Sequence, residues 1–157
     1  MRDLINRIEA TAGCRIFPPV GFPSVEPGHK LPMDLQQFYE LCGGVELFTE
    51  ELFSMRISSP AELVLANPVI IGERVDDISD SWYIVGRGGG SEFMSIDLHP
   101  DRLGTCYDSF WDVHGIPDSC AVIALSFSDL LERLLAACGG HWYWLEPDFV
   151  SLGDAYE

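Results

Sequence analysis

Two carboxylates and an imidazole lie close together in the segment Asp97-Leu98-His99-Pro100-Asp101. If a strand continued through this segment, Asp97 and His99 would share one face, because strand side chains alternate. With Asp101 they could then hold a metal ion or act on a small ligand. Pro100 would end such a strand, and the remaining histidines have no paired spacing such as HxxxH. We therefore predict a turn in which Asp97 accepts hydrogen bonds from loop amides, and a small-ligand or metal-dependent enzyme is the less favoured alternative.

Other patterns associated with catalysis are incomplete. The glycine-rich stretch 86–90 lacks the Lys-Ser/Thr of a phosphate-binding loop and precedes a strand, so it predicts a hairpin turn. Cys106 lies in a predicted strand with no recognisable base, and no GxSxG or SxxK motif occurs. The sequence therefore predicts a protein that is not an enzyme, with no catalytic residue, no metal site and no cofactor.

Acidic and aromatic residues gather in two other places, a loop after residue 72 and the end of the chain. Aromatic side chains rimmed by charged ones are typical of protein-binding surfaces. The predicted partner-binding residues are Glu73, Asp76, Asp77 and Asp80 in the loop, and Trp142, Trp144, Glu146 and Asp148 near the end. The alternative is that the loop only adds solubility and that the two tryptophans cover the sheet.

The balance of charge narrows the possible partners. Nine Lys and Arg residues stand against 25 Asp and Glu residues, a formal net charge of −16. Nucleic acids and anionic membranes would be repelled by such a protein, so we predict neither as a partner. A basic protein partner fits this charge, although solubility alone could also explain it.

The sequence indicates a cytoplasmic protein. Charged residues occupy positions 2, 3 and 7, where an export signal needs apolar residues, and no apolar run approaches the ~20 residues of a membrane helix. The five cysteines are spread out with no CxxC pair, so we predict that they are reduced and mostly buried. Cys42 and Cys138 fall on apolar positions of predicted helices.

The length of 157 residues suits one domain, which we assign to residues 1–157, with 140–157 as an aromatic and acidic C-terminal extension. Hydrophobic periodicity and turn residues predict helices at 4–12, 32–42, 59–66 and 126–138, and strands at 45–48, 52–57, 69–72, 82–86, 92–97, 105–108 and 121–123. This order predicts an α+β fold with a central, mostly antiparallel sheet flanked by N-terminal and C-terminal helices.

The order and spacing of these signals resemble the SUKH superfamily, specifically its Smi/Knr-like branch, over roughly Leu4 to Cys138. Residues 109–118 and the segment after Gly140 lie outside the resemblance. The matching positions are Leu31, Pro32, Phe38, Gly43, Gly44, Ile71, Gly72, the stretch 82–86, Phe93, Ile96, Asp97, Leu98, Gly104, Tyr107, Ser126, Phe127, Leu130 and Leu131.

What the resemblance implies is a single sheet flanked by helices and no catalytic activity. Bacterial members of this superfamily look like immunity proteins that neutralise a cognate polymorphic toxin, often a nuclease or deaminase, by binding it. Fungal relatives act as regulatory adaptors, so an intracellular adaptor without a toxin partner is the alternative function. The shared positions carry over as fold determinants: Trp82 and Phe93 would pack the core, Asp97 would cap a turn, and Gly43, Gly44, Gly72, Gly86 and Gly104 would allow tight turns.

Overall fold

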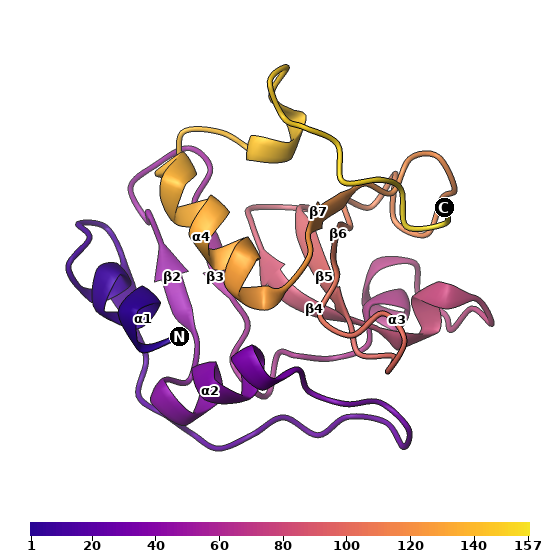
Figure 1. The fold of residues 1–157 in the computed structure, drawn as a ribbon, viewed down its shortest axis with the longest axis horizontal. Helices are drawn as coiled ribbons and strands as arrows, with labels where there is room; N and C mark the ends of the chain where they lie inside the picture. Colours follow the sequence, from indigo (N-terminus) through magenta and orange to yellow (C-terminus); the bar gives the residue numbers. More distant parts are fainter.

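A computed structural model describes residues 1–157 and contains one seven-stranded sheet (Figure 1). Each strand pairs antiparallel with the next strand in the chain, so the strand order is the sequence order. This arrangement confirms the predicted antiparallel α+β fold. The strands are β1 (Arg15–Ile16), β2 (Val45–Leu47), β3 (Met55–Ile57), β4 (Trp82–Arg87), β5 (Phe93–Asp97), β6 (Cys106–Asp108) and β7 (Val122–Ala124).

Three helices pack together and cover one face of the sheet. They are α1 (Arg2–Glu9), α2 (Met33–Leu41) and α4 (Phe127–Ala137), which all contact one another. The short helix α3 (Ala66–Ile70) contacts β4 and the 3₁₀ helix η1 (Ile78–Ser81), while a second 3₁₀ helix, η2 (Tyr143–Leu145), contacts α4. No helix has both the length and the apolar character needed to cross a membrane.

The middle of the sheet is buried on both faces. Along β4, Tyr83 and Val85 belong to the main core of 25 buried residues, which includes the apolar stripe of α4. Trp82 and Ile84 point the other way, as the alternation of strand side chains requires, into a second cluster of six buried residues. The C-terminal extension covers that second cluster with partly buried side chains, among them Tyr156.

Local signals account for the helix ends and the tightest turn. Ser126 Oγ accepts a hydrogen bond from the Asp129 backbone N–H at 3.1 Å, so it caps α4 as predicted. Pro32 was predicted as the first helical residue of α2 but is its N-cap, so the helix begins one residue later, at Met33. After α2, Gly44 has φ of +115°, and a Cβ on Gly43 would collide with the Pro18 carbonyl oxygen. Both glycines are therefore required by the turn.

Two predicted elements between residues 59 and 72 were wrong. Ser59 and Glu62 do bond each other as in a helix start, with Ser59 Oγ donating to Glu62 Oε2 at 2.8 Å. The following backbone pairs with β4 instead, because the Ile84 N–H donates to the Val64 carbonyl at 2.9 Å. The predicted strand 69–72 is the end of α3 and the turn after it, since no other strand lies beside it.

Smaller differences concern single residues. Cys138 is exposed, not buried, because α4 ends there in the left-handed conformation at φ of +52°. Phe93 lies at the margin of the second cluster and is partly exposed, whereas Trp82 is fully buried as predicted. The two-residue strand β1 was not predicted, because so short a segment has no periodicity to detect.

Candidate protein-binding surface

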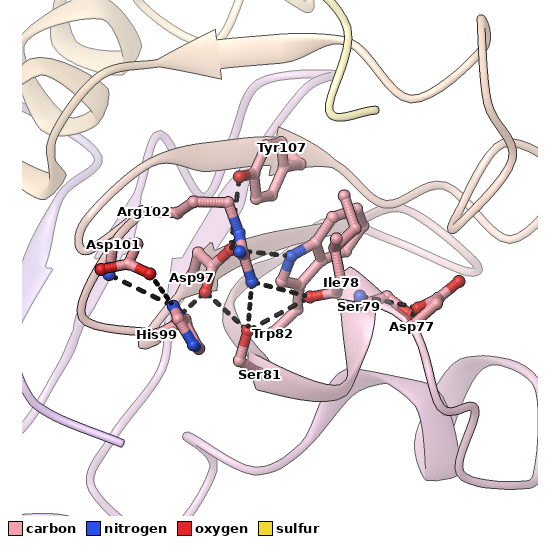
Figure 2. Close-up of polar contacts among 10 residues, drawn as sticks. All are labelled: Asp77, Ile78, Ser79, Ser81, Trp82, Asp97, His99, Asp101, Arg102 and Tyr107. Carbon is pink, nitrogen blue, oxygen red and sulfur yellow. Dashed lines mark hydrogen bonds and ion pairs between the residues drawn. The ribbon is translucent and has the colours of Figure 1, made fainter. Parts of the chain in front are cut away.

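Asp97, at the end of β5, is the centre of a buried polar cluster that also contains Trp82 and Arg102 (Figure 2). Its side chain has no exposed surface. Its oxygens accept hydrogen bonds from Ser81 Oγ at 2.7 Å, the His99 backbone N–H at 2.8 Å, Arg102 Nε at 2.7 Å, Trp82 Nε1 at 3.1 Å and Tyr107 Oη at 3.4 Å. The predicted hydrogen bond from a loop amide is present, donated by His99. Four further donors satisfy the remaining hydrogen-bond capacity of the carboxylate.

The other two members of the suspected metal or ligand site face away from Asp97. His99 is 40% exposed and Asp101 is 86% exposed, and their closest charged atoms are 3.8 Å apart. Figure 2 shows this pair on the outer side of the cluster, whereas Asp97 faces Trp82 and Arg102. No group of three or more His, Cys, Asp or Glu side chains is arranged to hold a metal ion. The three residues therefore hold a turn and assemble no common site.

A second buried polar chain lies beside α3. The His114 ring contacts Asn67 Oδ1 at 2.7 Å and Ser109 Oγ at 3.0 Å, and Asn67 Nδ2 donates to Ser79 Oγ at 2.8 Å. Burial lowers the pKa of His114 to about 4, an effect that the negative charge of Asp77 only partly opposes. The imidazole is therefore neutral at physiological pH and serves as a structural connection between these segments.

The acidic loop divides into internal and outward-facing carboxylates. Asp80 binds Arg74 through both oxygens at 2.9 to 3.1 Å. Asp77 caps η1 and accepts a hydrogen bond from Tyr156 Oη at 2.9 Å. Glu73 and Asp76 are exposed and have no hydrogen bond or ion pair. The structure thus leaves only these two members of the loop free for a partner.

The C-terminal extension is attached to the rest of the molecule along its length. Tyr143 Oη donates to the Ile123 carbonyl at 2.7 Å, and near the chain end the Val122 N–H donates to the Gly153 carbonyl at 3.0 Å. Figure 1 shows the extension leaving α4 and running past β7 to the C-terminus. Because β7 is an edge strand, the extension also covers exposed backbone groups of the sheet.

The two tryptophans of the extension are half-buried. Their rings stack at 5.5 Å between centroids, and Trp142 meets Phe53 edge-on at 5.0 Å. Trp144 Nε1 donates to Asp108 Oδ2 at 3.0 Å. The two predicted acidic neighbours lie further along, with Glu146 half-buried and Asp148 exposed. These contacts agree with the alternative that the tryptophans cover the sheet, yet each ring keeps an exposed part.

A cleft of about 270 Å³ opens between the extension and the strands. Eight of its 11 lining residues are hydrophobic and three are acidic. They are Met55, Glu92, Phe93, Met94, Asp108, Phe110, Asp112, Val113, Trp142, Trp144 and Leu145. Burial raises the pKa of Asp108, and the nearby negative charge of Asp112 adds to this shift, although the Phe110 amide and Trp144 indole oppose it. The cleft is therefore lined mainly by apolar side chains, with three acidic side chains among them.

Sequence reasoning identified only two residues of this cleft, Trp142 and Trp144. It missed the contribution of the segment after β6, where Phe110, Trp111 and Asp112 repeat the aromatic and acidic composition of the extension. This similar composition was the sequence signal that could have identified the segment as part of the cleft. The acidic loop lines no part of the cleft.

Comparison with known proteins matches most of the chain. A profile of the SMI1 / KNR4 family (SUKH-1) matches residues 3–133. The chain is also 50% identical over 155 residues to the immunity protein YokJ of Bacillus subtilis (strain 168), which covers 98% of this chain and 94% of that protein. The family match ends before η2, so the cleft combines a wall from the family domain with one from the extension.

Proposed function

The chain belongs to the SMI1 / KNR4 family (SUKH-1), and on that premise we propose that it is an immunity protein, which neutralises a cognate toxin by binding it directly. The observation that carries the proposal is the 50% identity to an immunity protein over 98% of the chain. The likeness extends beyond the family domain into the extension, because it spans 155 residues. The toxin partner is a basic protein domain of the nuclease or deaminase type.

Direct binding needs no chemistry from this chain. The carboxylate with the most donors, Asp97, is occupied by side chains of its own fold, which supports a non-catalytic role. A protein of net charge −16 attracts a domain that is basic where it holds a phosphate substrate. Its carboxylates can then occupy the place of the substrate, so inhibition follows from occupancy. The five cysteines are all free, which suits the reducing cytoplasm that we propose as the location.

The test is protection from the toxin. A candidate cognate toxin domain would be expressed in a sensitive host with and without the chain, and survival would be counted. We expect survival only in the presence of the chain. An otherwise active toxin that still kills in the presence of abundant soluble chain would contradict the immunity function, and a housekeeping protein as the sole specific partner would favour an adaptor.

The electrostatic part of the proposal has a separate test. Exposed charges are screened over about 10 Å at 0.1 M salt and about 3 Å at 1 M salt. We therefore expect the association rate of chain and toxin to fall steeply between roughly 50 and 500 mM salt. A rate that stays constant over this range would remove steering by charge from the proposal without affecting protection itself.

A further inference from the structure

The cleft beneath the extension offers flat aromatic faces to a ligand. Trp142 and Trp144 stack with an angle of 22° between their planes, so parallel indole faces line one wall. Trp142 also approaches the β4–β5 turn so closely that a Cβ on Gly88 would lie 3.0 Å from its ring. At the rim, Leu145 is 66% exposed and Trp111, beside Phe110, is 59% exposed. Exposed apolar surface of this kind is typical of a protein-binding site.

The same cleft contains negative charge that the fold does not neutralise. Glu92 Oε2 is buried and has no hydrogen-bond partner. Asp112 is exposed and forms no ion pair, and Asp108 receives only neutral donors, the Phe110 amide and the Trp144 indole. Arg87 lies over the Phe93 ring at 5.5 Å, and its Nε is likewise buried without a hydrogen-bond partner. Glu92 therefore has hydrogen-bond acceptor capacity that its own fold does not use.

We propose that this cleft receives an arginine side chain of the toxin, an inference that rests on the proposed immunity function and assigns its contact surface. An arginine fits better than a lysine, because its planar guanidinium stacks on aromatic faces and carries five donors in a fixed fork. The indoles of Trp142 and Trp144 supply the faces, and Glu92 and Asp112 supply acceptors. The methylene groups of the arginine would lie against the apolar lining.

This assignment explains why the cleft is both apolar and acidic. A purely apolar partner would bury the unpaired carboxylate of Asp112 without compensation, which is unfavourable. A small anionic ligand would be repelled by the three carboxylates. A guanidinium satisfies both requirements at once, and the basic surface of the proposed toxin provides one.

The first experiment measures the ligand chemistry directly, without the toxin. Nα-acetyl-arginine amide would be titrated into the full chain while the indole N–H signals are followed by NMR. We expect saturable shifts at Trp142 and Trp144 in the roughly millimolar range that a ligand of this size allows. Trp82, whose indole is buried against Asp97, is the internal control and should not respond. The neutral isostere Nα-acetyl-citrulline amide should bind at least about tenfold more weakly.

The second experiment uses charge-neutralising variants of near-identical shape. The double substitution Glu92→Gln and Asp112→Asn should weaken binding of the arginine amide, and the affinity for the toxin, by at least about tenfold. Glu132→Gln, an exposed position on α4 that lies outside the cleft, is the matched control and should change neither. These variants keep the indoles in place, so the test does not depend on whether a tryptophan substitution folds.

Equal binding of the arginine and citrulline amides would overturn the assignment, as would toxin affinity unchanged by the double substitution. In the latter case the wild-type chain would still protect against the toxin, so the immunity function would stand with another contact surface. Failure of the wild-type chain to protect would contradict the immunity function itself. The two proposals are thus tested by different outcomes.

Discussion

The buried cluster around Asp97 and the cleft around Glu92 combine the same kinds of residues, tryptophans with carboxylates, and use them differently. In the cluster, both oxygens of Asp97 have donors from the fold itself, including the guanidinium of Arg102. In the cleft, one oxygen of Glu92 is buried without a donor. A carboxylate that is fully satisfied internally holds the fold together, whereas an unsatisfied one at an open cleft is available to a partner.

The two regions also differ in how they are assembled. All five donors to Asp97 lie within 16 residues of it in the chain, and β4, β5 and β6 are neighbours in the sheet. The cleft draws on β3, β5, the segment after β6 and the extension. The cluster can therefore form as soon as the central strands pair, while the cleft exists only once the extension has docked.

The largest expected effect is on the cluster. Asp97→Ala would leave Arg102 Nε and Trp82 Nε1 without their acceptor. We expect the free energy of unfolding to fall by about 3–5 kcal/mol, the range for breaking a buried charged pair. Urea denaturation measures this loss. The exposed Asp101→Ala is the control and should stay within about 0.5 kcal/mol of wild type. A loss at Asp97 below about 1 kcal/mol would mean that the cluster is not structural.

The next effect concerns pH and the polar chain at His114. The folded protein holds this imidazole neutral down to about pH 4, whereas its pKa in the unfolded chain is near the ordinary histidine value of about 6.5. The unfolded chain therefore takes up the proton first as the pH falls, which favours unfolding. We expect the free energy of unfolding to drop by roughly 3 kcal/mol from this group between pH 6.5 and about 4.

His114→Gln should remove that part of the pH dependence, so the difference between the two unfolding profiles isolates this histidine from the acidic groups. The matched control is His99→Gln at the 40% exposed position, which should change the free energy of unfolding at neutral pH by less than about 0.5 kcal/mol. A variant at 114 that keeps the wild-type slope would contradict the depressed pKa.

A smaller effect is expected where the extension docks. Trp144→Phe removes the donor to Asp108 Oδ2 but keeps an aromatic ring in the cleft wall. We expect a loss of about 1–2 kcal/mol in unfolding free energy, because the buried acceptor Asp108 loses one of its partners. Trp111→Phe, at a 59% exposed position, should cost less than about 0.5 kcal/mol. Equal losses of unfolding free energy for the two variants would mean that Trp144 stabilises the fold no more than the exposed Trp111 does.

The smallest effect is expected in the acidic loop. Asp80→Asn breaks the ion pair with Arg74, and both side chains are substantially exposed, at 39% and 50%. Such pairs contribute about 0.2–1 kcal/mol, and salt screens them, so the difference from wild type should shrink in 1 M NaCl. A larger loss of unfolding free energy, or one that salt does not reduce, would mean that this ion pair stabilises the fold as the buried cluster does.

The sequence was most informative where the signals were local. Ser126 with Asp129, and the apolar stripe that follows, located the start of α4 because a cap and a helical period involve only nearby residues. The prediction for residues 59–72 was wrong because the structure of this segment depends on a distant strand. Ser59 and Glu62 do form the hydrogen bond of a helix start, but Val64 pairs with β4 and the chain stays extended. No residue pattern within the segment indicates that β4 lies beside it.

For the candidate site, the net charge, the presence of Trp142 and Trp144, and the capping role of Asp97 could all be predicted without the fold. Which carboxylates remain available depends on the folded arrangement of the chain. Asp77 and Asp80 are occupied by Tyr156 and Arg74, whereas Glu92 lies without a donor in an aromatic cleft. The physical reason is that hydrogen-bond satisfaction depends on donors that the fold brings from distant segments, and composition does not encode their positions.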